Sequence, residues 1–159
     1  MNKITLIFLF VFFFSFSTFS QLSVGENGNI EVKAGATLDV AGLEITPVND
    51  YNVSAGVSIQ KSNTSIALPN GDSMLRSYYM DPMLGDLSAT VVYNYEDADM
   101  NGISHNAKMV VVDDSGNSME YEDADDTDYQ VTSEFTDPTN FAIVTAGDAT
   151  LSIETVDGE

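Results

Sequence analysis

The sequence predicts an all-β protein, a single antiparallel β-sandwich of about ten short strands that follows an N-terminal signal segment. Three observations support this fold class. Apolar and polar residues alternate at a two-residue period in many short windows. Clusters of Gly, Pro, Asn and Asp separate these windows. Beyond the signal segment, no window longer than about eight residues carries the period of a helix.

Residues 1–20 have the composition of a signal peptide. Lys3 supplies the positive charge, residues 4–14 are apolar, and small residues precede Gln21. The apolar run is too short for a stable membrane-spanning helix, which takes about 20 residues, so a membrane anchor is the weaker alternative. We therefore expect a signal peptide over residues 1–20, a β-sandwich domain over residues 21–159, and no membrane insertion after the signal is removed.

The charge and the cysteine content restrict the possible partners and the compartment. The chain has 25 acidic and 5 basic residues, a formal net charge of −20 at pH 7. Nucleic acids and anionic lipids are recognised by clustered Lys and Arg, so this composition argues against both as partners. The sequence contains no cysteine, which excludes disulfides, thiolate metal sites and an acylated lipoprotein anchor.

The first half of the domain contains short alternating windows between glycine-containing turns. The earliest ones could open a sandwich or form rungs of a β-coil, and the sequence leaves both possibilities open. Ala55-Gly56 predicts a bulge or bend, and the run from Pro69 to Asp72 predicts a tight turn. The expected strands here are residues 30–33, 37–40, 43–45, 51–61 and 64–68.

The second half contains the clearest strand of the chain, residues 87–96, in which Leu87, Ala89, Val91, Tyr93 and Tyr95 share one face. Proline-containing turns are expected directly before this strand and directly after the strand 129–135. The remaining expected strands are residues 73–80, which are apolar except for Arg76, and residues 107–112, 129–135, 141–145 and 149–156, with turns at 81–86, 113–117 and 137–138.

An acidic turn directly after the clearest strand matches the first half of a calcium loop. Asp97, Asp99 and Asn101 stand at positions 1, 3 and 5, and Gly102 stands at the position of the sharp turn. Lys108 occupies position 12, where a complete loop has a bidentate Glu. These three residues are therefore candidate Ca²⁺ ligands, and the alternative is an Asx-rich turn in which Asn-Gly takes positive φ.

Other constellations are less specific. The acidic cluster at residues 120–128 is typical of a solvated loop. His105 is the single histidine, and we expect it to be a surface residue. Tyr78, Tyr79, Tyr93 and Tyr95 could form a platform for sugars, but their strand spacing favours packing in the core. Paired carboxylates could also serve a β-sandwich glycosidase, although 25 acids make such pairs unspecific.

Residues 35–53 (GATLDVAGLEITPVNDYNV), residues 88–111 (SATVVYNYEDADMNGISHNAKMVV) and residues 149–153 (ATLSI) together resemble a poorly characterised β-rich region. That region recurs in large secreted surface proteins of the Bacteroidetes, often just before a type IX sorting domain. The resemblance covers most of the domain and implies an extracellular, non-catalytic adhesive or structural module. No sorting domain follows residue 153, so we expect either a cell-surface or secreted protein, a periplasmic one, or a fragment of a longer protein.

These observations predict a secreted, non-catalytic adhesive or structural binding module with an extracellular protein or polysaccharide as its partner. The half-loop makes calcium the candidate stabilising ion. The alternative is a carbohydrate-binding or carbohydrate-hydrolysing β-sandwich. A third hypothesis is a structural protein that assembles through its edge strands.

Overall fold

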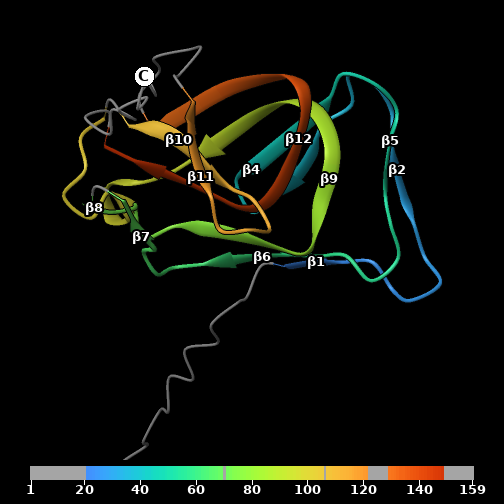
Figure 1. The fold of residues 1–159 in the computed structure, drawn as a ribbon, viewed down its shortest axis with the longest axis horizontal. Coiled ribbons are helices and arrows are strands. Elements are labelled where there is room, and N and C mark those ends of the chain that lie inside the picture. The colour runs from blue at the N-terminus through green and yellow to red at the C-terminus, as the bar shows by residue number, and fades with distance from the viewer. Residues whose placement is uncertain (1–20, 70, 106, 122–128, 149–159) are drawn as a thin grey trace, which may run out of the picture.

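The computed structural model describes residues 21–69, 71–105, 107–121 and 129–148 (Figure 1). The predicted signal peptide, most of the second acidic cluster and the predicted strand 149–156 lie outside these residues. The described elements are β1 (Gln21–Ser23), β2 (Ile30–Val32), β3 (Leu38–Val40), β4 (Leu43–Pro47), β5 (Tyr51–Val53), β6 (Ser58–Ser62), β7 (Ala67–Leu68), β8 (Gly71–Asp72), β9 (Ser77–Asn94), the 3₁₀ turn η1 (Asp97–Asp99), β10 (Lys108–Val112), β11 (Ser118–Tyr121) and β12 (Gln130–Gly147).

The protein is an all-β, sandwich-like fold in which two long strands run through both layers. β9 and β12 pair with each other antiparallel and bend together (Figure 1). In one layer the order is β3-β4-β9-β12, built on the last residues of β9 and the first of β12. In the other layer the order is β1-β6-β9-β12-β10-β11, built on their opposite halves. The predicted antiparallel all-β class is confirmed.

The predicted turns at residues 81–86 and 137–138 are wrong, because each lies inside one of the two long strands. Pro82 and Pro138 are exposed and lie where the β9–β12 ladder shifts register, between Ile143 and Phe141 and between Thr139 and Phe135. A proline at such a bulge removes no ladder hydrogen bond and bends the strand. The prolines therefore mark the corner at which the strands pass from one layer to the other, and no strand ends there.

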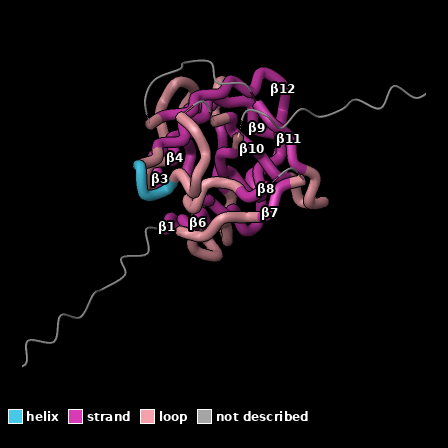
Figure 2. Tube along the Cα trace, turned by 90° about the vertical axis from the view of Figure 1, so that its left-hand side faces the viewer, coloured by secondary structure: helices cyan, strands magenta, loops and turns pink. Residues whose placement is uncertain are grey.

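The shorter elements follow the turn chemistry of the sequence. Ala41 and Gly42 both have positive φ, 56° and 94°, and close the tight β3–β4 hairpin. Asp113 accepts hydrogen bonds from the backbone N–H groups of Ser115 and Asn117, which closes the predicted β10–β11 hairpin. β2 pairs antiparallel with β5 as a separate ribbon (Figure 1), so the early strands are not rungs of a β-coil. β3 and β4 lie side by side within the main body of strands (Figure 2).

The core lies between the two layers and is filled by alternate residues of the long strands. The predicted inner face of residues 87–96 is confirmed, since Leu87, Ala89, Val91, Tyr93 and Tyr95 are all buried. β10 is buried on both faces as expected, because Val110 packs under Leu68 on the side away from the main core. Each large apolar side chain of this kind stabilises the fold by about 1.5–3 kcal/mol.

Helical structure is confined to η1 in the part of the chain described here. No described helix has the length and apolar character needed to cross a membrane.

Candidate functional site

The predicted calcium-loop residues lie in the connection that leaves β9 and leads to β10. Asp97 and Asp99 are the first and last residues of η1, and Asn101 and Gly102 follow with φ of 49° and 80°. Asn and Gly are the residues that adopt these left-handed conformations most readily. The predicted turn at Asn101-Gly102 is therefore confirmed, in the positive-φ form that an Asx-rich turn requires.

Asp99 points into the protein and forms a buried ion pair. Its Oδ2 lies 2.7 Å from Nη2 of Arg76, and the two side chains are only 11% and 8% exposed. The same oxygen accepts the backbone N–H of Glu96 at 2.9 Å, and Nη1 of Arg76 donates to the carbonyl of Asn94 at 2.6 Å. Asp99 thus fixes η1 to the residues just before β9.

Asn101 and Asp97 point to other partners. Nδ2 of Asn101 donates to the carbonyl of Ser73 at 3.0 Å, which ties the turn to the same segment that carries Arg76. Asp97 is exposed, and its Oδ1 accepts the hydroxyl of Tyr129 at 2.8 Å. Within the described ranges, no group of three or more His, Asp or Glu side chains converges as metal ligands would. Calcium binding at these residues stays a prediction.

Arg76 organises a polar network that the sequence did not predict as a site. Its backbone carbonyl accepts the hydroxyl of Tyr93 at 2.7 Å and that of Thr145 at 2.9 Å, while the hydroxyl of Tyr78 donates to the carbonyl of Ala41. Burial raises the pKa of Tyr78 to about 12 and also raises the pKa of Tyr93. The sequence feature that could have indicated this network is Arg76 itself, the one charged residue within the predicted strand 73–80.

The predicted tyrosine platform is divided between the core and the surface. Tyr78, Tyr93 and Tyr95 are buried, and Tyr79 is partly buried, so core packing is the correct interpretation for most of them. Among the tyrosines whose burial the structure describes, Tyr129 is the exposed one, 39% exposed directly before β12. Its φ of 64° is unusual for a residue other than Gly, Asn or Asp. The two-residue periodicity of the sequence did not indicate that Tyr129 would be exposed.

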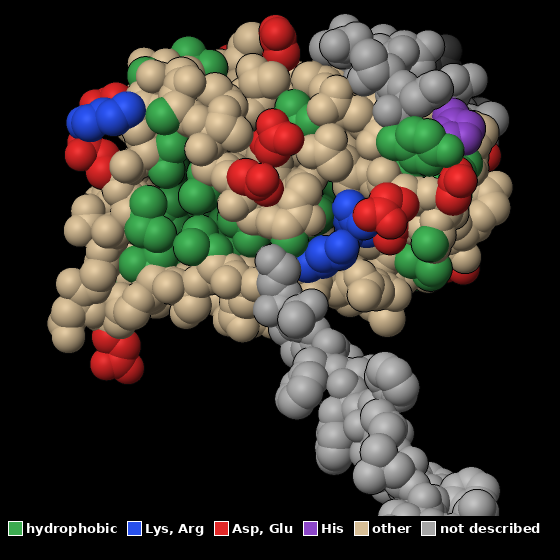
Figure 3. Space-filling view, turned by 180° about the vertical axis from the view of Figure 1, so that it is seen from behind, with side chains coloured by type: hydrophobic (Ala, Val, Ile, Leu, Met, Phe, Trp, Pro, Cys, Tyr) green, Lys and Arg blue, Asp and Glu red, His purple; other side chains and the backbone are tan. Residues whose placement is uncertain are grey.

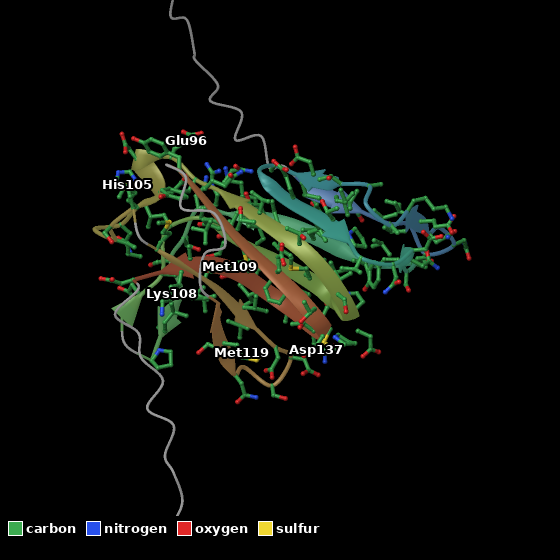
Figure 4. All side chains as sticks on the ribbon, turned by 90° about the horizontal axis from the view of Figure 1, so that it is seen from above. Glu96, His105, Lys108, Met109, Met119 and Asp137 are labelled. Atoms are coloured by element: carbon green, nitrogen blue, oxygen red, sulfur yellow. The ribbon has the colours of Figure 1, made fainter. Side chains whose placement is uncertain are left out.

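Tyr95, His105 and Tyr129 form an aromatic cluster beside the acidic turn. The ring of Tyr129 lies 5.7 Å from that of Tyr95 and 5.1 Å from that of His105, and the latter pair is nearly perpendicular. The hydroxyl of Tyr95 lies 3.4 Å from Nδ1 of His105. His105 is exposed, as predicted, and lies with Glu96 at one end of the molecule (Figure 4).

This end of the molecule carries a shallow, open depression of about 430 Å³. It is lined by Tyr95, Glu96, Asp97, Ala98 and Tyr129. Tyr95 is buried and the other four residues are exposed, so the exposed ring of Tyr129 lies beside two carboxylates at the surface, with the ring of Tyr95 behind it. We call these five residues the tyrosine–acid pocket. Figure 3 shows hydrophobic, acidic and histidine side chains together at this end.

The pocket is held in shape by contacts from three parts of the chain. The backbone N–H of Tyr95 donates to the carbonyl of Tyr129, and Asp97 holds the Tyr129 hydroxyl. The buried ion pair of Asp99 with Arg76 anchors η1 to the interior of the protein. Comparisons of the chain with protein-family models, with curated proteins and with solved structures find no match, so the arrangement of these side chains is the basis for assigning a function.

Proposed function

We propose that the protein is a secreted, non-catalytic binding module that contacts an extracellular partner through the tyrosine–acid pocket. The observation that carries this proposal is the position of Tyr129, which is 39% exposed yet fixed by its hydrogen bond to Asp97 and by its packing on Tyr95 and His105. A tyrosine held in this way offers a large contact area and loses little conformational entropy on binding.

The backbone of Tyr129 supports a role for this side chain beyond packing. A residue with a Cβ held at a φ of 64° is strained by about 1–3 kcal/mol, and such strain persists where the surroundings impose it, often at binding sites. Glycine would relieve the strain at this position but would remove the ring from the pocket. An exposed tyrosine at a strained position fits a surface that serves recognition.

The proposed partner is an extracellular protein or polysaccharide. The signal-like residues 1–20 and the resemblance to surface proteins of the Bacteroidetes support a secreted location. A periplasmic location is the alternative. The formal net charge of −20 favours basic or neutral partners, because like charges repel across an interface.

Carbohydrate binding is the second candidate function, and the exposed ring of Tyr129 is the observation that favours it. Sugar rings stack on exposed aromatic faces, and Glu96 and Asp97 could accept hydrogen bonds from sugar hydroxyls. The open shape of the pocket fits a binding role for these carboxylates.

The purified protein should be applied to a glycan array and to an array of purified extracellular proteins that includes basic ones. Every ligand found should then be measured with Tyr129→Ala and with Val48→Ala, which removes an exposed apolar side chain elsewhere on the surface. We expect Tyr129→Ala to weaken binding at least tenfold and Val48→Ala to leave it unchanged. Equal binding by both variants would remove the pocket from the proposal.

A further inference from the structure

The pocket combines the two kinds of group that recognise an organic cation. The faces of tyrosine rings attract ammonium and guanidinium groups, and nearby carboxylates add direct electrostatic attraction. Tyr129 supplies the exposed ring, the buried ring of Tyr95 lies 5.7 Å behind it, and Glu96 and Asp97 supply exposed carboxylates at the same depression. The negative charge of the whole chain would add a long-range attraction for a basic partner.

The hydrogen bond between Tyr129 and Asp97 strengthens this combination. The phenol donates its proton to a carboxylate at 2.8 Å, which increases the electron density of the ring. Glu96 has a neighbouring charge already, since its Oε1 lies 3.7 Å from Nη2 of Arg76. Asp97 is therefore the carboxylate best placed to attract a further positive group.

The shape of the pocket indicates the kind of molecule that carries the cation. Sites for free small molecules enclose most of the ligand surface, whereas this depression is open and shallow. A cationic group bound here would therefore remain largely exposed unless it were attached to a larger partner that covered the rest of the surface. A hard metal ion would need several converging oxygens, while an organic cation needs ring faces and one or two carboxylates.

We infer that the tyrosine–acid pocket binds the guanidinium or ammonium group of an arginine or lysine side chain on a basic extracellular protein. This inference rests on the proposed function and specifies the ligand class of the same pocket. It also assigns roles within the pocket. Tyr129 is the exposed ring on which the cation lies, Tyr95 supports that ring from below, and Asp97 polarises the ring and supplies the opposite charge.

Three short peptides that differ at one residue test the inference. The probe is an uncharged Gly/Ser peptide with one central arginine, and its counterparts carry lysine or citrulline at that position. Citrulline has nearly the shape of arginine but no charge. Binding is followed by NMR chemical-shift titration at constant ionic strength, with Ala98 as a reporter inside the pocket. We expect the arginine and lysine peptides to shift the pocket resonances and citrulline to bind at least tenfold more weakly.

Matched variants separate the pocket from the general negative charge. Asp97→Asn keeps an oxygen that can accept the Tyr129 hydroxyl but removes the charge. Asp137→Asn removes the same charge from an exposed residue that lies well away from Glu96 (Figure 4). We expect Asp97→Asn to weaken arginine binding about tenfold and Asp137→Asn to have little effect. Tyr129→Leu should weaken binding to a similar extent, and Tyr129→Phe should retain most of it because the ring remains.

Two results would overturn the inference. The first is equal or undetectable binding of the arginine and citrulline peptides. The second is an equal loss in Asp97→Asn and Asp137→Asn, which would mean that the overall charge attracts the peptide. If the cation peptides fail while a glycan or protein ligand still depends on Tyr129, the ligand class is wrong and the binding function stands. If no ligand depends on Tyr129, the proposed function fails as well.

Discussion

Asp99 and Arg76 form an ion pair 2.7 Å long with both side chains almost fully buried. The pair joins the turn after β9 to the residues that precede it, at the two ends of one long strand. Breaking a buried pair leaves one charge without compensation, and this is more costly than replacing both partners by apolar residues. Burial of Arg76 has a further cost, because its Nε has no hydrogen-bond partner among the described residues.

We predict that Asp99→Ala lowers the free energy of unfolding by about 3–5 kcal/mol, measured by urea denaturation. The exposed Asp137→Ala should change it by less than about 0.5 kcal/mol. The double variant Arg76→Met/Asp99→Leu should recover most of the loss, since it buries no unpaired charge. If Asp99→Ala were as stable as Asp137→Ala, the buried pair would have no structural role.

Gly42 gives a prediction with a closely matched control. A Cβ at Gly42 would lie 3.3 Å from Nη1 of Arg76 and 3.3 Å from the Tyr78 hydroxyl, and the residue has a φ of 94°. Gly35 has a φ of 75° but no atom within 4 Å of the same position. Both alanine variants suffer the backbone strain, and only Gly42→Ala also crowds the polar network.

We therefore expect Gly35→Ala to cost about 1–2 kcal/mol of unfolding free energy and Gly42→Ala about 2–4 kcal/mol. Thermal or urea denaturation of the two variants side by side measures the difference. Equal losses would show that the network around Arg76 adapts to the extra methyl group.

Stability at high pH depends on the buried tyrosines. Burial raises the pKa of Tyr78 to about 12, above the ordinary value of 10. The folded protein therefore holds this proton where the unfolded chain has lost it. The stabilisation is fully present below pH 10 and is lost as the pH rises towards 12, and a rise from 10 to about 12 corresponds to about 3 kcal/mol.

We expect cooperative unfolding between about pH 10 and pH 12, with ionisation of the buried Tyr78 and Tyr93 occurring together with unfolding. Absorbance of tyrosinate and far-ultraviolet circular dichroism, recorded on the same samples, give the two curves. Tyr78→Phe should unfold at higher pH than the parent protein when both start from equal stability at pH 7. Ionisation of all tyrosines near pH 10 without unfolding would contradict the burial of the network.

Calcium binding at Asp97, Asp99 and Asn101 has a specific signature. Because Asp99 is bound to Arg76, a calcium ion would have to share or replace that contact. If the site forms, millimolar calcium should raise the melting temperature relative to a chelator, and Asp97→Asn should abolish the rise while Asp137→Asn retains it. No heat in calorimetric titration and no shift in melting temperature would remove the calcium hypothesis.

Much of the fold could be predicted from local patterns. The alternation of Leu87 to Tyr95, the apolar run of β10 and the hairpin at Asp113 each depend on neighbouring residues, so the sequence contains the signal. The merging of four predicted strands into β9 and β12 could not be predicted. Pro82 and Pro138 are typical of turns, and only the partner strands determine that they lie at bulges.

The candidate site was predicted in part. The acidic residues and the Asn-Gly turn were visible because they are adjacent in the sequence. The pairing of Asp99 with Arg76 and of Asp97 with Tyr129 joins residues that are 23 and 32 positions apart, and no local pattern contains such contacts. The predicted strand 129–135 includes Tyr129, whereas in the structure this residue has a positive φ, precedes β12 and is exposed.

The two layers of the sandwich share their central strands, and this has a consequence for how the molecule opens. The two layers cannot separate unless the hydrogen-bonded ladder between β9 and β12 is disrupted. We therefore expect backbone hydrogen exchange in these two strands to occur only by global unfolding. The ribbons β2–β5 and β7–β8 belong to separate small sheets and can open alone. The tyrosine–acid pocket directly follows the last residues of β9 and precedes the first of β12, so we expect its frame to open only with the central ladder.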